Sequence, residues 1–192
     1  MRRVLVLLAA CLALASCDRV LDNDGPVRDV SGLVRDLQFT MTDETGRTVH
    51  ASDFRGAPVL LYFGYTHCPD VCPTTLARLA QAAQAAAPRL RIVFVTVDPA
   101  RDTTRQLAQY VHAFGPRVKG LRSGVGELED VARRYRVAYS RGKPDAQGEY
   151  EVMHSSGVFA FDGEGRARLM ILPGASESDI ESALRRLAAA NA

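Results

Sequence analysis

The stretch that decides the fold is APVLLYFGYTHCPDVCPTTLARLAQAAQAAAP, residues 57–88. Residues 57–65 form an apolar run of strand length, as expected for a strand that is buried on both faces. From Pro73 to Pro88 the segment predicts a helix, because proline suits a first helical turn and alanine favours the helical state. The loop between them carries Cys68 and Cys72. This loop is therefore expected at the carboxyl end of a buried strand, where open α/β sheets tend to carry their functional sites.

The remainder of the chain continues this alternation of strands and helices. Upstream, residues 37–54 predict a β-hairpin that turns at Glu44-Thr45-Gly46. Downstream, we expect a strand at 90–99, a helix at 101–116 capped by Asp102, and a short helix at 126–137. Further strands are predicted at 137–141, 152–162 and 166–172, before a last helix that starts near Ser176. The expected fold is α/β, with a mixed sheet, helices on both faces and an N-terminal β-hairpin.

Residues 1–16, MRRVLVLLAACLALAS, are expected to be an export signal, because a basic start precedes an apolar run and small residues. The run is short for a membrane-spanning helix, which needs roughly 20 residues. The segment from Leu14 to Cys17 resembles the bacterial lipobox, in which the cysteine becomes the lipid-modified first residue of the mature chain. An ordinary signal with an incidental Cys17 is the alternative. Residues 17–34 are then expected to be a tether, and residues 35–192 the folded domain.

Removal of residues 1–16 would change both the charge and the set of thiols. Arg2 and Arg3 would be lost, so the formal net charge of +2 would fall to about zero, and nucleic acid is not an expected partner. Cys11 would be lost and Cys17 blocked by lipid, which leaves Cys68 and Cys72 as free thiols. A disulfide across so short a loop would add little stability to a domain of this size. The two cysteines are therefore expected to have a chemical role rather than to form a structural disulfide.

The spacing of the two cysteines leaves a redox pair, a nucleophile with its resolving partner and a metal site all open. Both flank the predicted helix start, whose unpaired amides and dipole favour thiolates. As metal ligands they would need another donor, for which imidazole is the usual choice. The candidates are His50, His67, His112 and His154. His154, just before an apolar strand, would close the site from the opposite side, although a solvated histidine remains the alternative.

The segment YFGYTHCPDVCPTTL, residues 62–76, resembles the signature loop of the Sco/SenC family of copper-binding, thioredoxin-like assembly factors of cytochrome c oxidase. A second block, VTVDPARDTTRQLAQYVHAFG at 95–115, matches that family's Asp-Pro-x-Arg-Asp-Thr segment and the helix after it. The resemblance covers about residues 35–190 and implies a thioredoxin-like fold. Two positions depart from the family pattern. Met153 stands where an acidic residue is frequent, and Thr104 stands where proline is common.

The resemblance also implies a copper site. Copper, as Cu(I) or Cu(II), would be bound by Cys68, Cys72 and His154. Asp98, in the second block, would lie beside these ligands without binding the metal. Asp70, inside the loop, would either do the same or be a solvated turn residue that caps local amides.

By the same resemblance the chain would be a copper chaperone rather than an enzyme, facing the periplasm. Asp18 resembles the signal that retains a lipoprotein in the bacterial inner membrane, where lipid on Cys17 would anchor it. The implied partner is the oxidase subunit that carries the binuclear copper centre, and another periplasmic copper carrier is a further candidate. The alternative function is a thiol–disulfide reductase that keeps the oxidase's copper-ligand cysteines reduced. There Cys68 would attack, Cys72 would resolve, and His154 would have no role.

Overall fold

The computed structural model describes residues 25–189. Its strands are β1 (Val27–Asp29), β2 (Thr40–Asp43), β3 (Thr48–His50), β4 (Val59–Gly64), β5 (Arg91–Thr96), β6 (Val118–Arg122), β7 (Tyr139–Arg141), β8 (Val152–His154), β9 (Val158–Phe161) and β10 (Ala167–Ile171). Its helices are α2 (Val71–Ala86), α3 (Thr104–His112), α4 (Val125–Arg134) and α5 (Glu177–Ala189), with a short 3₁₀ helix, η2 (Ala51–Phe54). Within these residues no helix is both long and apolar enough to cross a membrane.

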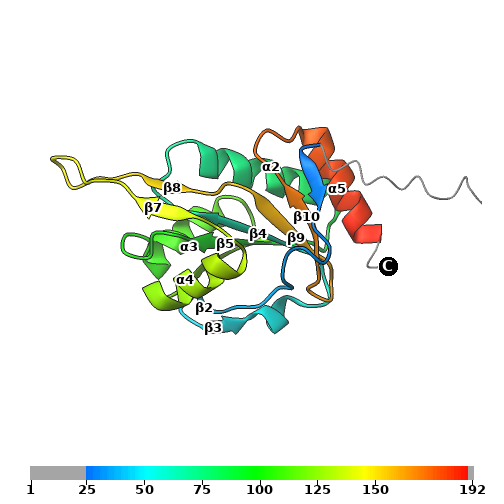
Figure 1. The fold of residues 1–192 in the computed structure, drawn as a ribbon, viewed down its shortest axis with the longest axis horizontal. Coiled ribbons are helices and arrows are strands. Elements are labelled where there is room, and N and C mark those ends of the chain that lie inside the picture. The colour runs from blue at the N-terminus through cyan, green and yellow to red at the C-terminus, as the bar shows by residue number, and fades with distance from the viewer. Residues whose placement is uncertain (1–24, 190–192) are drawn as a thin grey trace, which may run out of the picture.

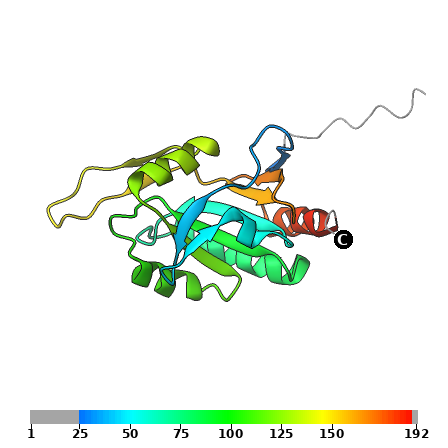
Figure 2. The same ribbon diagram turned by 90° about the horizontal axis from the view of Figure 1, so that it is seen from below.

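Eight strands form one mixed sheet in the order β1-β10-β9-β4-β5-β6-β2-β3, while β7 and β8 pair separately (Figure 1). The central strand β4 is parallel to β5 and antiparallel to β9, and all six of its residues are buried. Figure 2 shows α4 on one side of the sheet and α2, α3 and α5 on the other. The predicted α/β fold with helices on both faces and an early hairpin, β2–β3, is confirmed.

The strand register determines which residues, distant in sequence, lie together at the end of the sheet where the cysteine loop begins. Tyr62 of β4 pairs with Val158 of β9, Val158 with Ile171 of β10, and Ile171 with Val27 of β1. Because β9 is antiparallel to β4, the start of β9 lies beside the carboxyl end of β4. The segment just before β9, which contains His154, is therefore brought to the cysteine loop.

The strands of the structure differ from the prediction at two places. Strand β6 (Val118–Arg122) was not predicted, because Lys119, Gly120 and Arg122 interrupt its apolar pattern. The strand predicted over 152–162 is divided, since Ser155, Ser156 and Gly157 separate β8 from β9. A β-carbon on Gly157 would come within 2.5 Å of the Met170 Cε, so the break lies where β10 packs closely.

Strand β1 pairs with the edge strand β10, so the latter part of the predicted tether, 17–34, packs onto the domain as an outer strand. The Pro26 carbonyl extends this pairing by accepting from the Leu172 amide. The predicted export signal 1–16, Cys17 and the tether up to residue 24 lie outside the described residues, and their assignments stay predictions.

Candidate metal centre

The topology brings one cysteine and one histidine into contact across 82 positions of sequence. The Cys72 Sγ lies 3.5 Å from the His154 Nε2. Cys72 is in the first turn of α2, which follows β4, and His154 ends β8 shortly before β9. Their contact is a consequence of the antiparallel pairing of β4 with β9.

Cys72 is fully buried and is not part of a disulfide. Burial raises its pKa to about 12, although a backbone hydrogen bond from Tyr65 acts in the opposite direction. The expectation that the helix start makes both cysteines thiolates is therefore wrong for Cys72. Burial removes water from this sulfur, and this destabilises the thiolate more than the amides at the helix start stabilise it.

Cys68 occupies the outer position of the pair and is partly exposed. The Cys72 amide donates to the Cys68 Sγ at 3.4 Å, so the positive end of α2 faces this sulfur. Of the two thiols, Cys68 is therefore the one that an incoming molecule meets first.

His154 is oriented by its other ring nitrogen. The Nδ1 lies 3.0 Å from the Ser155 carbonyl oxygen, which can only accept, so Nδ1 carries the proton of this bond. In the neutral ring Nε2 then has a free lone pair, and Nε2 is the atom that faces Cys72. The Tyr65 ring packs edge-on against the imidazole with 6.0 Å between centroids, and Tyr62 packs at 6.4 Å. The histidine is thus held with a donor nitrogen directed at the sulfur.

Two sulfurs and an imidazole suit a soft or borderline metal ion. In residues 25–189 no three cysteine, histidine or acidic side chains already converge as a closed metal cage. The Cys72–His154 pair is preformed, and Cys68 lies beside it at the helix start. The Tyr62 hydroxyl is buried next to Cys72. The donor set of two sulfurs and one imidazole fits a centre that is completed when an ion binds.

Asp98 and Asp70, both expected near the ligands, have different surroundings. Asp98 is buried, and its carboxylate accepts from the Arg101 Nε at 2.6 Å and the Tyr150 hydroxyl at 2.8 Å. Asp70 is exposed and accepts from the Thr74 hydroxyl at 3.3 Å. No hydrogen bond among the described residues joins either carboxylate to a cysteine or to His154. Asp70 thus has the local contacts of a turn residue, and Asp98 is connected to the hairpin β7–β8.

Asp102 has a role that the sequence did not reveal. The cap predicted at Asp102 is wrong, because Thr103 caps α3 in a capping box with Gln106. Asp102 is instead fully buried and accepts from the Thr66 amide at 2.9 Å and the Thr66 hydroxyl at 2.6 Å. It also accepts from the Thr96 hydroxyl at 2.5 Å. It therefore fastens the start of the cysteine loop to the end of β5, and only the fold shows which donors it meets.

Met153 and the remaining histidines do not join the centre. The Met153 side chain is 70% exposed, on the opposite side of β8 from His154 as strand alternation requires. The His67 Nδ1 lies 3.3 Å from an Asp102 carboxylate oxygen. His50 contacts Thr40 in the β2–β3 hairpin, and His112 is exposed at the end of α3. Of the four histidines, His154 is the one in contact with a cysteine.

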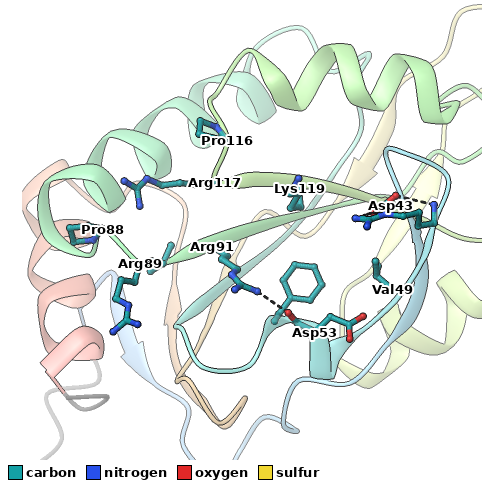
Figure 3. Close-up of a pocket in the computed structure, with 12 residues that line it drawn as sticks. Asp43, Val49, Asp53, Pro88, Arg89, Arg91, Pro116, Arg117 and Lys119 are labelled. Atoms are coloured by element: carbon teal, nitrogen blue, oxygen red, sulfur yellow. Dashed lines mark hydrogen bonds and ion pairs between the residues drawn. The ribbon is translucent and has the colours of Figure 1, made fainter.

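A cavity of about 510 Å³ lies at the other edge of the sheet, where β5 and β6 begin (Figure 3). Its lining is rich in cations: Arg47, Arg89, Arg91, Arg117 and Lys119. Asp43 and Asp53 also line it, but no described cysteine or histidine does. The positive charge of this cavity opposes a metal cation, so it is separate from the candidate metal centre.

Comparison with known proteins gives a family match over most of the chain. A family model described as SCO1/SenC matches residues 33–189. The chain is 42% identical over 132 residues to a curated Bos taurus protein named "Protein SCO2 homolog, mitochondrial", which covers 66% of this chain and 50% of that protein. The chain thus spans about half the length of the curated relatives it matches.

Two similar solved structures contain copper. Arabidopsis thaliana ScoI with copper bound is 30% identical with a TM-score of 0.74, covering 79% of this chain and 96% of that one. Bradyrhizobium japonicum ScoI with copper bound is 31% identical with a TM-score of 0.70, covering 80% of this chain and 99% of that one. The predicted resemblance in sequence and in fold is confirmed.

Proposed function

The chain belongs to the SCO1/SenC family, and from this we propose that it is a copper chaperone that helps to assemble cytochrome c oxidase. Copper is its cargo, and Cys68, Cys72 and His154 are the proposed ligands. The observation that carries the proposal is the 3.5 Å contact between the Cys72 Sγ and the His154 Nε2, with Cys68 at the same helix start. Copper bound to the two similar structures supports the choice of metal.

The donor set explains how one site can serve both oxidation states of copper. Thiolate ligands favour Cu(I), and imidazole makes Cu(II) acceptable as well. Both thiols would release their protons on binding, so the affinity depends on pH. The burial of Cys72 and the partial exposure of Cys68 leave one side of the site open. An acceptor's ligands can enter from that side and displace Cys68 first.

The proposed recipient is the oxidase subunit that carries the binuclear copper centre, with another periplasmic copper carrier as a further partner. Lipid on Cys17 would anchor the chain to the bacterial inner membrane with the domain in the periplasm. This part rests on residues 1–18, since the curated relative named above is described as mitochondrial. Pro26 and Val27 lie at the sheet edge of the cysteine loop. The nine residues from Cys17 to Pro26 can span at most about 30 Å. A lipid on Cys17 would therefore keep the end of the sheet that carries the cysteine loop near the membrane.

The proposal is tested by His154→Ala with both cysteines intact, and His112→Ala is the matched control because His112 is exposed on α3. The purified chain is titrated with Cu(I) and Cu(II), and oxidase activity is measured in a deletion strain that carries each variant. His154→Ala should lose tight copper binding and oxidase assembly, whereas His112→Ala should retain both. Tight copper binding by His154→Ala equal to that of the parent chain would contradict the proposed ligand set.

A thiol–disulfide reductase is the second candidate, and the partial exposure of Cys68 in front of the buried Cys72 supports it. The Cys68 thiolate would attack a partner's disulfide, forming a mixed disulfide and releasing one partner thiolate. Cys72 would then attack the Cys68 sulfur, release the second partner thiolate and leave a Cys68–Cys72 disulfide. The partner gains the two electrons that the cysteine pair loses.

The structure changes one expectation about this reductase. The His154 Nε2 is close enough to accept the proton of the Cys72 thiol, so His154 would have a role in resolving as well. Loss of assembly in His154→Ala therefore does not separate the two functions. His154→Met does, because a thioether binds Cu(I) but accepts no proton at neutral pH. Assembly retained in His154→Met favours the chaperone, and failure of His154→Met with copper binding intact favours the reductase.

A further inference from the structure

His154 lies on an element that the main sheet does not hold. Within residues 25–189, strand β8 pairs with β7 alone, in a separate two-stranded sheet, and the segment 142–151 between them projects from the domain (Figure 1). The pairing of the two strands continues one residue further, where the Ser155 amide donates to the Ala138 carbonyl at 2.9 Å. The position of the imidazole therefore depends on what fixes β7–β8 to the rest of the molecule.

Arg101, in the loop after β5, bridges that loop and the hairpin. Its Nε donates to the Asp98 carboxylate at 2.6 Å, in a pair whose side chains are 15% and 5% exposed. One terminal nitrogen donates to the Tyr150 carbonyl at 2.8 Å, and the other pairs with the Glu149 carboxylate at 3.0 Å. A single guanidinium thus joins the β5 loop to the residues that enter β8. Its planar set of donors suits such a junction better than an ammonium would.

The Tyr150 ring completes the junction. The ring lies 3.6 Å from the Arg101 guanidinium carbon and 3.8 Å from that of Arg141 in β7, so it stacks with both. Its hydroxyl donates to Asp98 at 2.8 Å. Asp98 therefore accepts from both Arg101 and Tyr150, and the three side chains form a closed set of contacts. This closed set, Asp98, Arg101 and Tyr150, is called the hairpin clamp.

The hairpin clamp lies close to His154 in sequence and in space. Tyr150 precedes His154 by four residues, and Val152 between them is buried. The Arg101 guanidinium also lies 5.9 Å from the centre of the Tyr65 ring, whose edge-on contact with His154 was described above. The clamp thus restrains β8 on its entry side, and Tyr65 restrains the ring itself.

We propose that Arg101 is a positioning residue, which holds β7–β8 through Tyr150 and Asp98 so that the His154 Nε2 stays directed at Cys72. This inference rests on the proposed function for its consequence in metal binding, and on hairpin geometry alone for its structural part. It also assigns Asp98 a role: Asp98 acts on His154 through the hairpin rather than beside the sulfurs.

The structural part is tested without metal, by amide hydrogen exchange on the full chain. Arg101→Met keeps the aliphatic stem and removes the guanidinium, and Arg105→Met, exposed on α3, is the matched control. Arg101→Met should speed exchange in β7, β8 and Ser155 and leave β4, β5 and α2 unchanged. Arg101→Lys should fall between Arg101→Met and the parent chain. Unchanged exchange across 139–155 in Arg101→Met would overturn the proposal.

The functional part is tested by copper titration in a double-mutant cycle with His154→Ala. Loss of a residue that orients a ligand typically lowers metal affinity by roughly tenfold to a hundredfold, so this is the loss expected for Arg101→Met. In the His154→Ala background the same change should cost nothing further, because no imidazole is left to position. The nitrogen hyperfine coupling of bound Cu(II) should weaken in Arg101→Met and persist in Arg105→Met. An equal loss of affinity in both backgrounds would overturn the proposal.

The two proposals fail in different ways. A parent chain that binds no copper would contradict the proposed function, while faster exchange of the hairpin in Arg101→Met would still support the clamp. A parent chain that binds copper, with Arg101→Met equal to it in affinity and exchange, would contradict the clamp alone.

Discussion

Gly64→Ala is expected to damage the fold and the metal centre together. Gly64 ends β4 and is buried directly beneath the site. A β-carbon there would lie 2.6 Å from the Phe94 Cε2 and 3.0 Å from the Cys72 Sγ. Both neighbours are fully buried, so neither can turn outward into solvent. The added methyl therefore has to displace an aromatic ring, a ligand sulfur or β4 itself.

The expected size of the loss follows from these contacts. Extra atoms in a closely packed core typically cost about 1–3 kcal/mol, and a contact as short as 2.6 Å to a buried ring places this variant in the upper half of that range. A loss of about 2 kcal/mol corresponds to a fall in Tm of roughly 4–8 °C for a domain of this size. Displacement of the Cys72 sulfur should also weaken copper binding, since the 3.5 Å contact with His154 would lengthen.

The assay is urea denaturation together with copper titration. Gly126→Ala is the matched control, because Gly126 lies in α4 and a β-carbon there meets nothing within 4 Å. That control should be neutral or stabilising by up to about 1 kcal/mol, as alanine favours helix. Combining Gly64→Ala with Phe94→Leu should reduce the cost of the glycine change, because the ring that makes the shortest contact is gone. Equal stability of Gly64→Ala and Gly126→Ala would refute the packing argument.

Three further predictions concern charge and hydrogen bonding. Burial alone would raise the pKa of Asp43, but hydrogen bonds from Thr45 and Arg47 outweigh it and lower that pKa to about 2 from 3.8. Since the native pKa is the lower one, this carboxylate contributes about 2 kcal/mol above pH 4, which is lost as the pH falls toward 2. Asp43→Asn should remove that part of the acid dependence of urea unfolding, and an unaltered dependence would show the reasoning to be mistaken. Asp102→Ala should lower the free energy of urea unfolding by about 3–5 kcal/mol, because three buried or partly buried donors lose their acceptor. Asp102→Asn should lower it by about 1–2 kcal/mol. Equal losses in the two variants would argue against the network. In the reduced, metal-free chain at pH 8, iodoacetamide should label Cys68 well before Cys72, because Cys72 is buried and its pKa is raised to about 12; equal labelling by peptide mapping would contradict this.

The central strand, the cysteine loop and the helix after it could be predicted because their signals are local. Residues 59–64 are apolar at every position, and both faces of β4 are covered. The alanine-rich segment after Cys72 forms α2, although the helix begins at Val71, two residues before the predicted start at Pro73. Hydrophobic periodicity and helix propensity depend on a few neighbouring residues, so both can be recognised in the sequence of one chain.

Other parts of the fold have weak local signals. Strand β6 carries a lysine, a glycine and an arginine, yet it forms because β5 and β2 supply partners on either side. The sequence predicts Asp102 to be a helix cap. Its true partners could not be predicted, because the threonines that donate to it come from the cysteine loop and from β5. The hairpin clamp could not be predicted either, since Arg101 and Tyr150 are 49 positions apart.

The amino-acid order alone was enough to identify the two sulfurs, the helix that begins beside them and the family pattern around them. It could name His154 as a candidate, but it could not show that this imidazole meets Cys72 rather than Cys68, or that Cys72 is the buried thiol. Those outcomes depend on the antiparallel pairing of β9 with β4 and on the close packing around Cys72. Contacts between residues 82 positions apart, and the loss of water around one sulfur, exist only when the whole chain is folded.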